Sequence, residues 1–66
     1  DLVLEANETL FPIEIKKTAH PEKRMTANFS VFDKGSLKRG TGAVICLVDG
    51  LSAFDKKTLI IPSWYI

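Results

Sequence analysis

Residues 1–17 show a hydrophobic pattern typical of a β-hairpin. Residues 1–6 alternate loosely, residues 9–17 form a second strand, and Asn7-Glu8 between them can form a two-residue turn because Asn tolerates positive φ. With this turn, opposed residues have numbers that sum to fifteen, so Asp1 lies opposite Glu14. One face of the hairpin is predicted to be core, and it carries Leu2, Leu4, Phe11, Ile13 and Ile15. The opposite face carries Asp1, Val3, Glu5, Leu10, Pro12, Glu14 and Lys16.

A helix follows the hairpin. Met25, Phe29 and Phe32 recur at i, i+4 and i+7, which is the spacing of one apolar helix face. Proline suits the first helical position, so the pattern predicts a helix from about Pro21 to about Lys34. The three apolar side chains are expected to form a core stripe.

Two further strands are predicted after the helix. Residues 36–42 form a loop rich in glycine and basic residues, and residues 43–48 are apolar throughout, as in a strand buried on both faces. Residues 51–54 form a short connector or weak strand, and residues 58–61 form the final strand.

The order of these elements predicts an α/β fold with a mixed sheet. The sheet contains an antiparallel hairpin, a parallel strand reached through a crossover helix, and a final strand. The crossover from the second strand to residues 43–48 is expected to be parallel and right-handed. Sixty-six residues allow one small domain, spanning residues 1–66.

Composition narrows the classes of function. A hydrophobic fraction of 45% is typical of a globular chain, and the net charge of +1 favours no class of partner by itself. The single cysteine, Cys46, excludes an internal disulfide framework and a cysteine-rich zinc site. No apolar stretch approaches the roughly 20 residues of a membrane span, so a cytoplasmic protein is expected. Binding to nucleic acid would need clustering of the basic pairs Lys16-Lys17, Lys23-Arg24, Lys38-Arg39 and Lys56-Lys57.

The ends of the chain suggest a fragment. The chain has no initiator Met, Asp1 opens a strand, and the last residues are the apolar Trp64-Tyr65-Ile66. The expectation is that residues 1–66 are the C-terminal part of a longer protein whose other segments cover one flank of the sheet. Exposed sheet edges would then allow the fragment to self-associate.

The candidate chemistry lies at Asp1, Glu14 and Lys16. Opposed residues of an antiparallel pair have Cβ atoms roughly 4.5–5.5 Å apart, so two carboxylates there repel unless a cation lies between them. Mg²⁺ would relieve that repulsion and bridge to a substrate phosphate. Lys16 returns to the same face as Glu14 and could stabilise developing negative charge. The alternative from spacing alone is a solvated face with a cross-strand ion pair.

Several segments resemble the PD-(D/E)XK nuclease-like superfamily, and more closely a C-terminal domain of unknown function found in prokaryotic AAA+ ATPases. The similar segments are residues 1–5 (Asp-Leu-Val-Leu-Glu), 10–18 (Leu-Phe-Pro-Ile-Glu-Ile-Lys-Lys-Thr), 28–31, 42–47 and 61–66. Together they span nearly the whole chain, and Pro-Ile-Glu-Ile-Lys-Lys is the most specific of them.

The resemblance implies a restriction-endonuclease-like core with Asp1 and Glu14 as metal-binding carboxylates and Lys16 as the catalytic lysine. It also implies a hypothetical Mg²⁺ cofactor, DNA as a partner, and an ATPase domain in cis. The family core has a further helix and strand before the Asp, which would lie upstream of residue 1. The chain contains no Gly-rich phosphate loop.

Two alternatives to a nuclease-like module stay open. The first is a non-catalytic interaction or regulatory domain of the ATPase, with a vestigial site and a sheet face that docks a partner. The second is a structural cap from a longer chain. A cation between Asp1 and Glu14 would favour the nuclease, whereas Glu14 capped by Lys16 or Lys17 without room for a cation would favour the regulatory domain.

Overall fold

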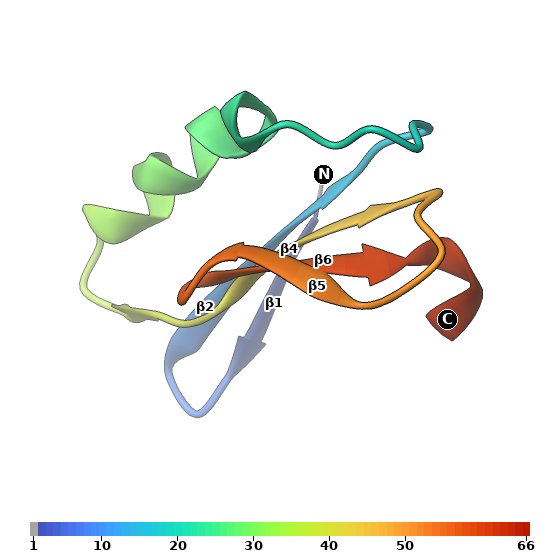
Figure 1. The fold of residues 1–66 in the computed structure, drawn as a ribbon. Coiled ribbons are helices and arrows are strands. Elements are labelled where there is room, and N and C mark those ends of the chain that lie inside the picture. The colour runs from blue at the N-terminus through green and yellow to red at the C-terminus, as the bar shows by residue number, and fades with distance from the viewer. Residues whose placement is uncertain (1) are drawn as a thin grey trace.

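The structure is a computed structural model that describes residues 2–66. Within that range the chain forms a small mixed α/β domain with one six-stranded mixed sheet (Figure 1). In chain order the elements are β1 (Leu2–Ala6), β2 (Thr9–Ile15), the 3-10 helix η1 (Lys23–Asp33), β3 (Lys38–Arg39), β4 (Gly42–Cys46), β5 (Ser52–Asp55), β6 (Thr58–Pro62) and the 3-10 turn η2 (Ser63–Tyr65).

The hairpin and its turn confirm the prediction from sequence. Asn7 and Glu8 have φ angles of 52° and 62°, the two positive values that a type I′ hairpin turn requires. β1 and β2 are antiparallel, with Leu2 opposite Ile13 and Ala6 opposite Thr9. Every pair in this register sums to fifteen.

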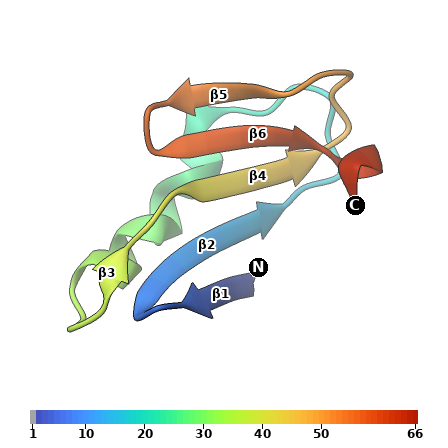
Figure 2. The same ribbon diagram turned by 90° about the horizontal axis from the view of Figure 1, so that it is seen from below.

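The sheet has the strand order β1-β2-β4-β6-β5, and the short β3 pairs with the start of β2 (Figure 2). β2, β4 and β6 are mutually parallel, so the predicted parallel crossover from β2 to β4 is confirmed. β5 is antiparallel to β6 and forms one edge of the sheet, where a connector or weak strand was expected. The predicted loop 36–42 contains β3 and leads directly into β4.

The predicted helix is present, but it is a 3-10 helix and spans Lys23–Asp33 rather than 21–34. Apart from Ala27, its residues from Thr26 to Phe32 are intrinsically weak α-helix formers. The hydroxyls of Thr26 and Ser30 donate to carbonyl oxygens three residues earlier, at 2.8 and 3.3 Å. Residues three apart share a face in a 3-10 helix, so the row that faces the sheet is Thr26, Phe29 and Phe32. Phe29 is buried, and the other two are half-buried.

The helix packs on the side of the sheet that carries Pro12 and Glu14, so the predicted core face of the hairpin is wrong. Pro12 and Glu14 are buried, whereas Ile15, which was expected to anchor the strand in the core, is exposed. Both faces of the hairpin carry several apolar side chains, so its alternation could not determine which face η1 covers. The core cluster lies on the covered face and consists of Val44, Cys46 and Ile60, with Val48 and Phe54 packed against it.

The all-apolar segment forms the buried strand that the sequence predicted. All five residues of β4 are buried, although the strand ends at Cys46 and not at residue 48. Its first residue, Gly42, lies under the ring of Phe29, where a Cβ atom would be only 2.8 Å from the ring. This close approach brings η1 down onto the sheet.

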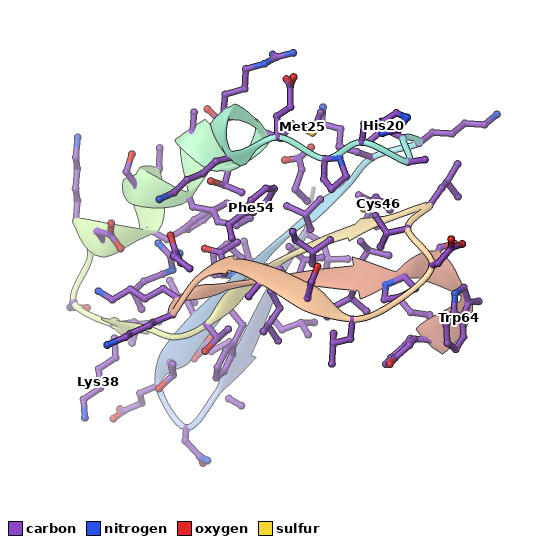
Figure 3. The ribbon with its side chains drawn as sticks, viewed as in Figure 1. His20, Met25, Lys38, Cys46, Phe54 and Trp64 are labelled. Carbon is purple, nitrogen blue, oxygen red and sulfur yellow. The ribbon has the colours of Figure 1, made fainter. Side chains whose placement is uncertain are left out.

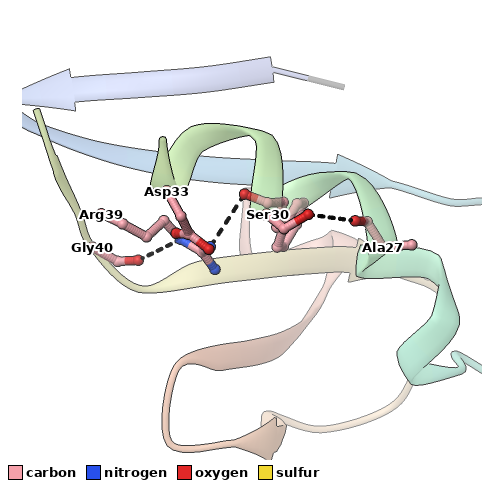
Figure 4. A network of polar contacts seen from close by, with 6 residues as sticks. Ala27, Ser30, Asp33, Arg39 and Gly40 are labelled. Carbon is pink, nitrogen blue, oxygen red and sulfur yellow. Dashed lines mark hydrogen bonds and ion pairs between the residues drawn. The ribbon is translucent and has the colours of Figure 1, made fainter. Parts of the chain in front are cut away.

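Arg39, in β3, links this strand to the C-terminal end of η1 through hydrogen bonds and an ion pair. Its guanidinium lies 3.1 Å from the Asp33 carboxylate, donates to the carbonyl oxygens of Phe29 and Gly40, and lies over the Phe29 ring (Figure 4). The Arg39 side chain is only 16% exposed. One partly buried cation therefore fixes the position of η1 beside Glu14.

Candidate functional site

Glu14 is an acidic side chain in a buried position. It lies near the end of β2, where its backbone partner on the neighbouring strand is Val44. The side chain is only 9% exposed. Burial of a carboxylate costs free energy unless a charge or hydrogen bond compensates it, so its partner decides what the site can do.

That partner is Lys16. Its Nζ atom lies 3.4 Å from Oε2 of Glu14, and its side chain is 46% exposed. The Lys16 amide donates to the carbonyl oxygen of Ile45 at 3.0 Å, which extends the contact between β2 and β4 by one residue. The predicted proximity of Glu14 and Lys16 is therefore confirmed, and the buried carboxylate is paired with a half-exposed lysine.

Asp1, the third member of the predicted site, lies outside the described residues. In the register of β1 and β2, the numbers of opposed residues sum to fifteen, which is the rule that predicted Asp1 opposite Glu14. The Asp1–Glu14 pair itself stays a prediction.

A cavity of about 350 Å³ lies beside Glu14, between the hairpin and η1. Its walls are mostly apolar, and Glu14 supplies a carboxylate. The lining residues are Leu2, Val3, Pro12, Ile13, Glu14, Asn28, Phe29, Val31 and Phe32. The sequence identified Phe29 and Phe32 only as core. Their contribution to a cavity wall depends on how η1 crosses the hairpin, which spacing alone did not indicate.

The acidic side chain near the cavity meets part of what a metal ion needs. Among residues 2–66, no three His, Cys, Asp or Glu side chains gather where they could hold one. Mg²⁺ needs fewer protein ligands than that, because it takes one or two carboxylates and keeps several waters. Glu14 fits as one such carboxylate, and the adjoining cavity offers space for water. Glu14 is the one carboxylate among the described residues that line the cavity, and the sequence predicts Asp1 as the second ligand.

Ion pairs with neighbouring carboxylates lower the positive charge of the basic pairs. Four cations in them have an acidic neighbour, in the pairs Lys16–Glu14, Lys23–Asp55, Arg24–Glu22 and Arg39–Asp33. Such pairing lowers the local positive potential that would attract a phosphate backbone. The exposed Lys16-Lys17 pair lies next to Glu14, so it is the basic pair best positioned to meet a substrate at this site.

Comparison of the chain with protein-family models, with curated proteins and with solved structures finds no match. Among the described residues, no helix has the length and apolar character needed to cross a membrane.

Proposed function

We propose that this chain is a nuclease-like, divalent-metal-binding module that interacts with DNA and forms the C-terminal domain of an AAA+ ATPase. The observation that carries the proposal is the buried Glu14 carboxylate with the Lys16 ammonium 3.4 Å away, at the rim of a cavity. The parallel β2–β4 pair and the helix between those strands agree with the restriction-endonuclease-like core that the resemblance implies.

In this proposal Glu14 and Asp1 hold Mg²⁺, which would polarise a phosphate and lower the pKa of a bound water. Glu14 is fixed by β2 and by the walls around it, so its carboxylate is held in place before substrate binds. Lys16 is half exposed and can turn from Glu14 towards a phosphate oxygen, where its charge would stabilise the negative charge of the transition state.

A second candidate is a non-catalytic interaction or regulatory domain of the ATPase with a vestigial site. The same ion pair supports it, because a lysine that neutralises Glu14 removes the need for a cation. The largely apolar walls of the cavity also suit an apolar group better than a phosphate.

Metal binding and DNA cleavage by the full-length protein distinguish the two candidates. Titration calorimetry with Mg²⁺ and Mn²⁺ and a plasmid-cleavage assay would be run on the wild type, Glu14→Gln and Lys16→Ala. Lys17→Ala is the matched control, since it removes the same charge from the adjacent exposed position.

The nuclease proposal expects metal-dependent cleavage that falls by at least 100-fold in Glu14→Gln and Lys16→Ala but not in Lys17→Ala. Glu14→Gln should also lose metal binding, whereas Lys16→Ala should keep it. Cleavage that survives both substitutions, or that no divalent ion supports, would reject the catalytic assignment. Absence of metal binding in the wild type would favour the regulatory domain.

A further inference from the structure

The face of the sheet opposite η1 is apolar and partly exposed, although Ala43 and Ile45 of the central strand β4 are only 7% and 8% exposed on it. The hairpin register and the β2–β4–β6 register place one set of side chains on this face, and it includes Leu2, Leu4, Ile15, Ile45, Leu59 and Ile61. Four of them are substantially exposed: Leu2 is 43%, Leu4 51%, Ile15 53% and Leu59 37% exposed. Figure 2 views the sheet from this side, with η1 behind it. We call this surface the open face.

The open face carries no charge on its main strands. By the same registers, the residues that β1, β2, β4 and β6 contribute to it include no Asp, Glu, Lys or Arg. A sheet face that is meant for water normally carries polar side chains at these positions. Parallel strands are normally covered on both sides. Here η1 packs on one side, and Ile15 of β2 and Leu59 of β6 stay exposed on the other.

The C-terminal turn extends the apolar surface. η2 follows β6 and lies on the side of the sheet away from η1 (Figure 1). Figure 3 shows Trp64 projecting at that end of the sheet. Trp64 is 66% exposed, and its ring lies 4.6 Å from that of Tyr65, centroid to centroid. The open face therefore continues into two exposed aromatic rings.

The size of this surface is in the range that a weak dimer needs. Half-exposed Leu, Ile, Trp and Tyr side chains together offer on the order of 500 Å² of apolar area. Contiguous apolar patches larger than a few hundred Å² mark interaction sites on soluble proteins. Weak and transient interfaces bury up to about 1,200 Å² in total, or roughly 600 Å² from each partner.

We propose that the open face is a homodimer interface, occupied by the open face of a second copy of this chain. A two-fold axis places the same patch on both partners, and an uncharged apolar patch can meet itself without leaving a charge buried. Two sheets then pack face to face about 10 Å apart. Leu2 borders both the open face and the Glu14 cavity, but Glu14 itself lies on the other side of the sheet, under η1, so the dimer does not cover its carboxylate.

Sedimentation equilibrium of the 66-residue chain over 1–500 μM tests the proposal. Leu4→Lys and Leu59→Lys each place a charge on the open face at a position that already contacts water. Ala27→Lys is the matched control, because it places the same charge on an exposed residue of η1 that lies outside the cavity lining. Circular dichroism confirms that each variant is folded.

The wild type and Ala27→Lys should move from monomer to dimer across this range, with a mass approaching twice 7.3 kDa. Leu4→Lys and Leu59→Lys should weaken dimerisation by at least 10-fold. A wild type that stays monomeric at 500 μM would overturn the proposal, as would a dimer that persists in both open-face variants, because that dimer would form through a sheet edge. Larger aggregates that persist in both variants would overturn it equally.

Discussion

Substitution of Gly42 by alanine should destabilise the domain, because the space above this glycine is filled by Phe29. A Cβ at residue 42 would lie 2.8 and 2.9 Å from two ring carbons and 3.3 Å from a guanidinium nitrogen of Arg39. Carbon atoms in contact prefer about 3.5–4.0 Å, so the ring or the strand must move by roughly 0.7 Å. The ring cannot move freely, since it is buried and Arg39 lies over it.

Overpacking of this kind costs about 1–3 kcal/mol. For a domain of this size each kcal/mol lowers Tm by roughly 4–8 °C, so Gly42→Ala should lower Tm by about 4–24 °C. The cost is steric and not a matter of backbone strain, because Gly42 does not have a positive φ. Gly35→Ala is the control, since no atom lies within 4 Å of its Cβ position, and it should be neutral or slightly stabilising.

A double-mutant cycle with Phe29→Leu tests the mechanism. Urea denaturation followed by circular dichroism would give the free energy of unfolding of the wild type, both single variants and the double variant. If the ring causes the damage, a smaller residue 29 should recover at least about 1 kcal/mol of the cost of Gly42→Ala. Additivity within about 0.5 kcal/mol, or a Gly42→Ala variant as stable as Gly35→Ala, would refute the reasoning.

Two further predictions concern the turn and an acidic surface residue. Glu8→Gly should stabilise the hairpin by about 0.4–1 kcal/mol, because Glu8 has a φ of 62° that glycine adopts without steric cost; a lower Tm than that of the wild type would contradict this. The pKa of Asp55 lies below its ordinary value, first because the Lys57 amide donates to its carboxylate and second because the Lys23 side chain pairs with it. Its contribution to stability is present above the unfolded-state pKa and is lost as the pH falls through the folded-state pKa. Lys23→Met should therefore raise the pKa of Asp55 only part of the way to its ordinary value in an NMR titration, and full recovery would show that the Lys57 amide has no effect.

Local signals in the sequence predicted the parts of the fold that depend on neighbouring residues. Asn7 at the first turn position fixed the hairpin, and the hairpin fixed the register that carries Glu14. Residues 43–48 were recognised as a buried strand because a strand that is covered on both faces is apolar at every position and does not alternate with polar residues. Glu14 and Lys16 were expected on one face, and two residues of strand spacing bring them together.

The errors arose where tertiary packing decides. The sequence could not indicate which face of the hairpin η1 would cover. Ile15 was therefore expected in the core and Glu14 on the solvent-facing side of the hairpin. The i, i+4, i+7 spacing of Met25, Phe29 and Phe32 suggested an α-helix, whereas hydroxyl–carbonyl bonds and weak propensities accompany a 3-10 helix with a three-residue period. The cavity beside Glu14 follows from that same packing.

Because Cys46 is buried, the reactivity of its thiol can report on the stability of the fold. It is the single cysteine of the chain, it is 1% exposed, and it belongs to the central core cluster. A buried thiol is inert until the structure around it opens, so its alkylation rate measures the population of opened molecules. The effect of each variant on core opening can thus be followed at neutral pH without denaturant, with a thiol reagent and no engineered label.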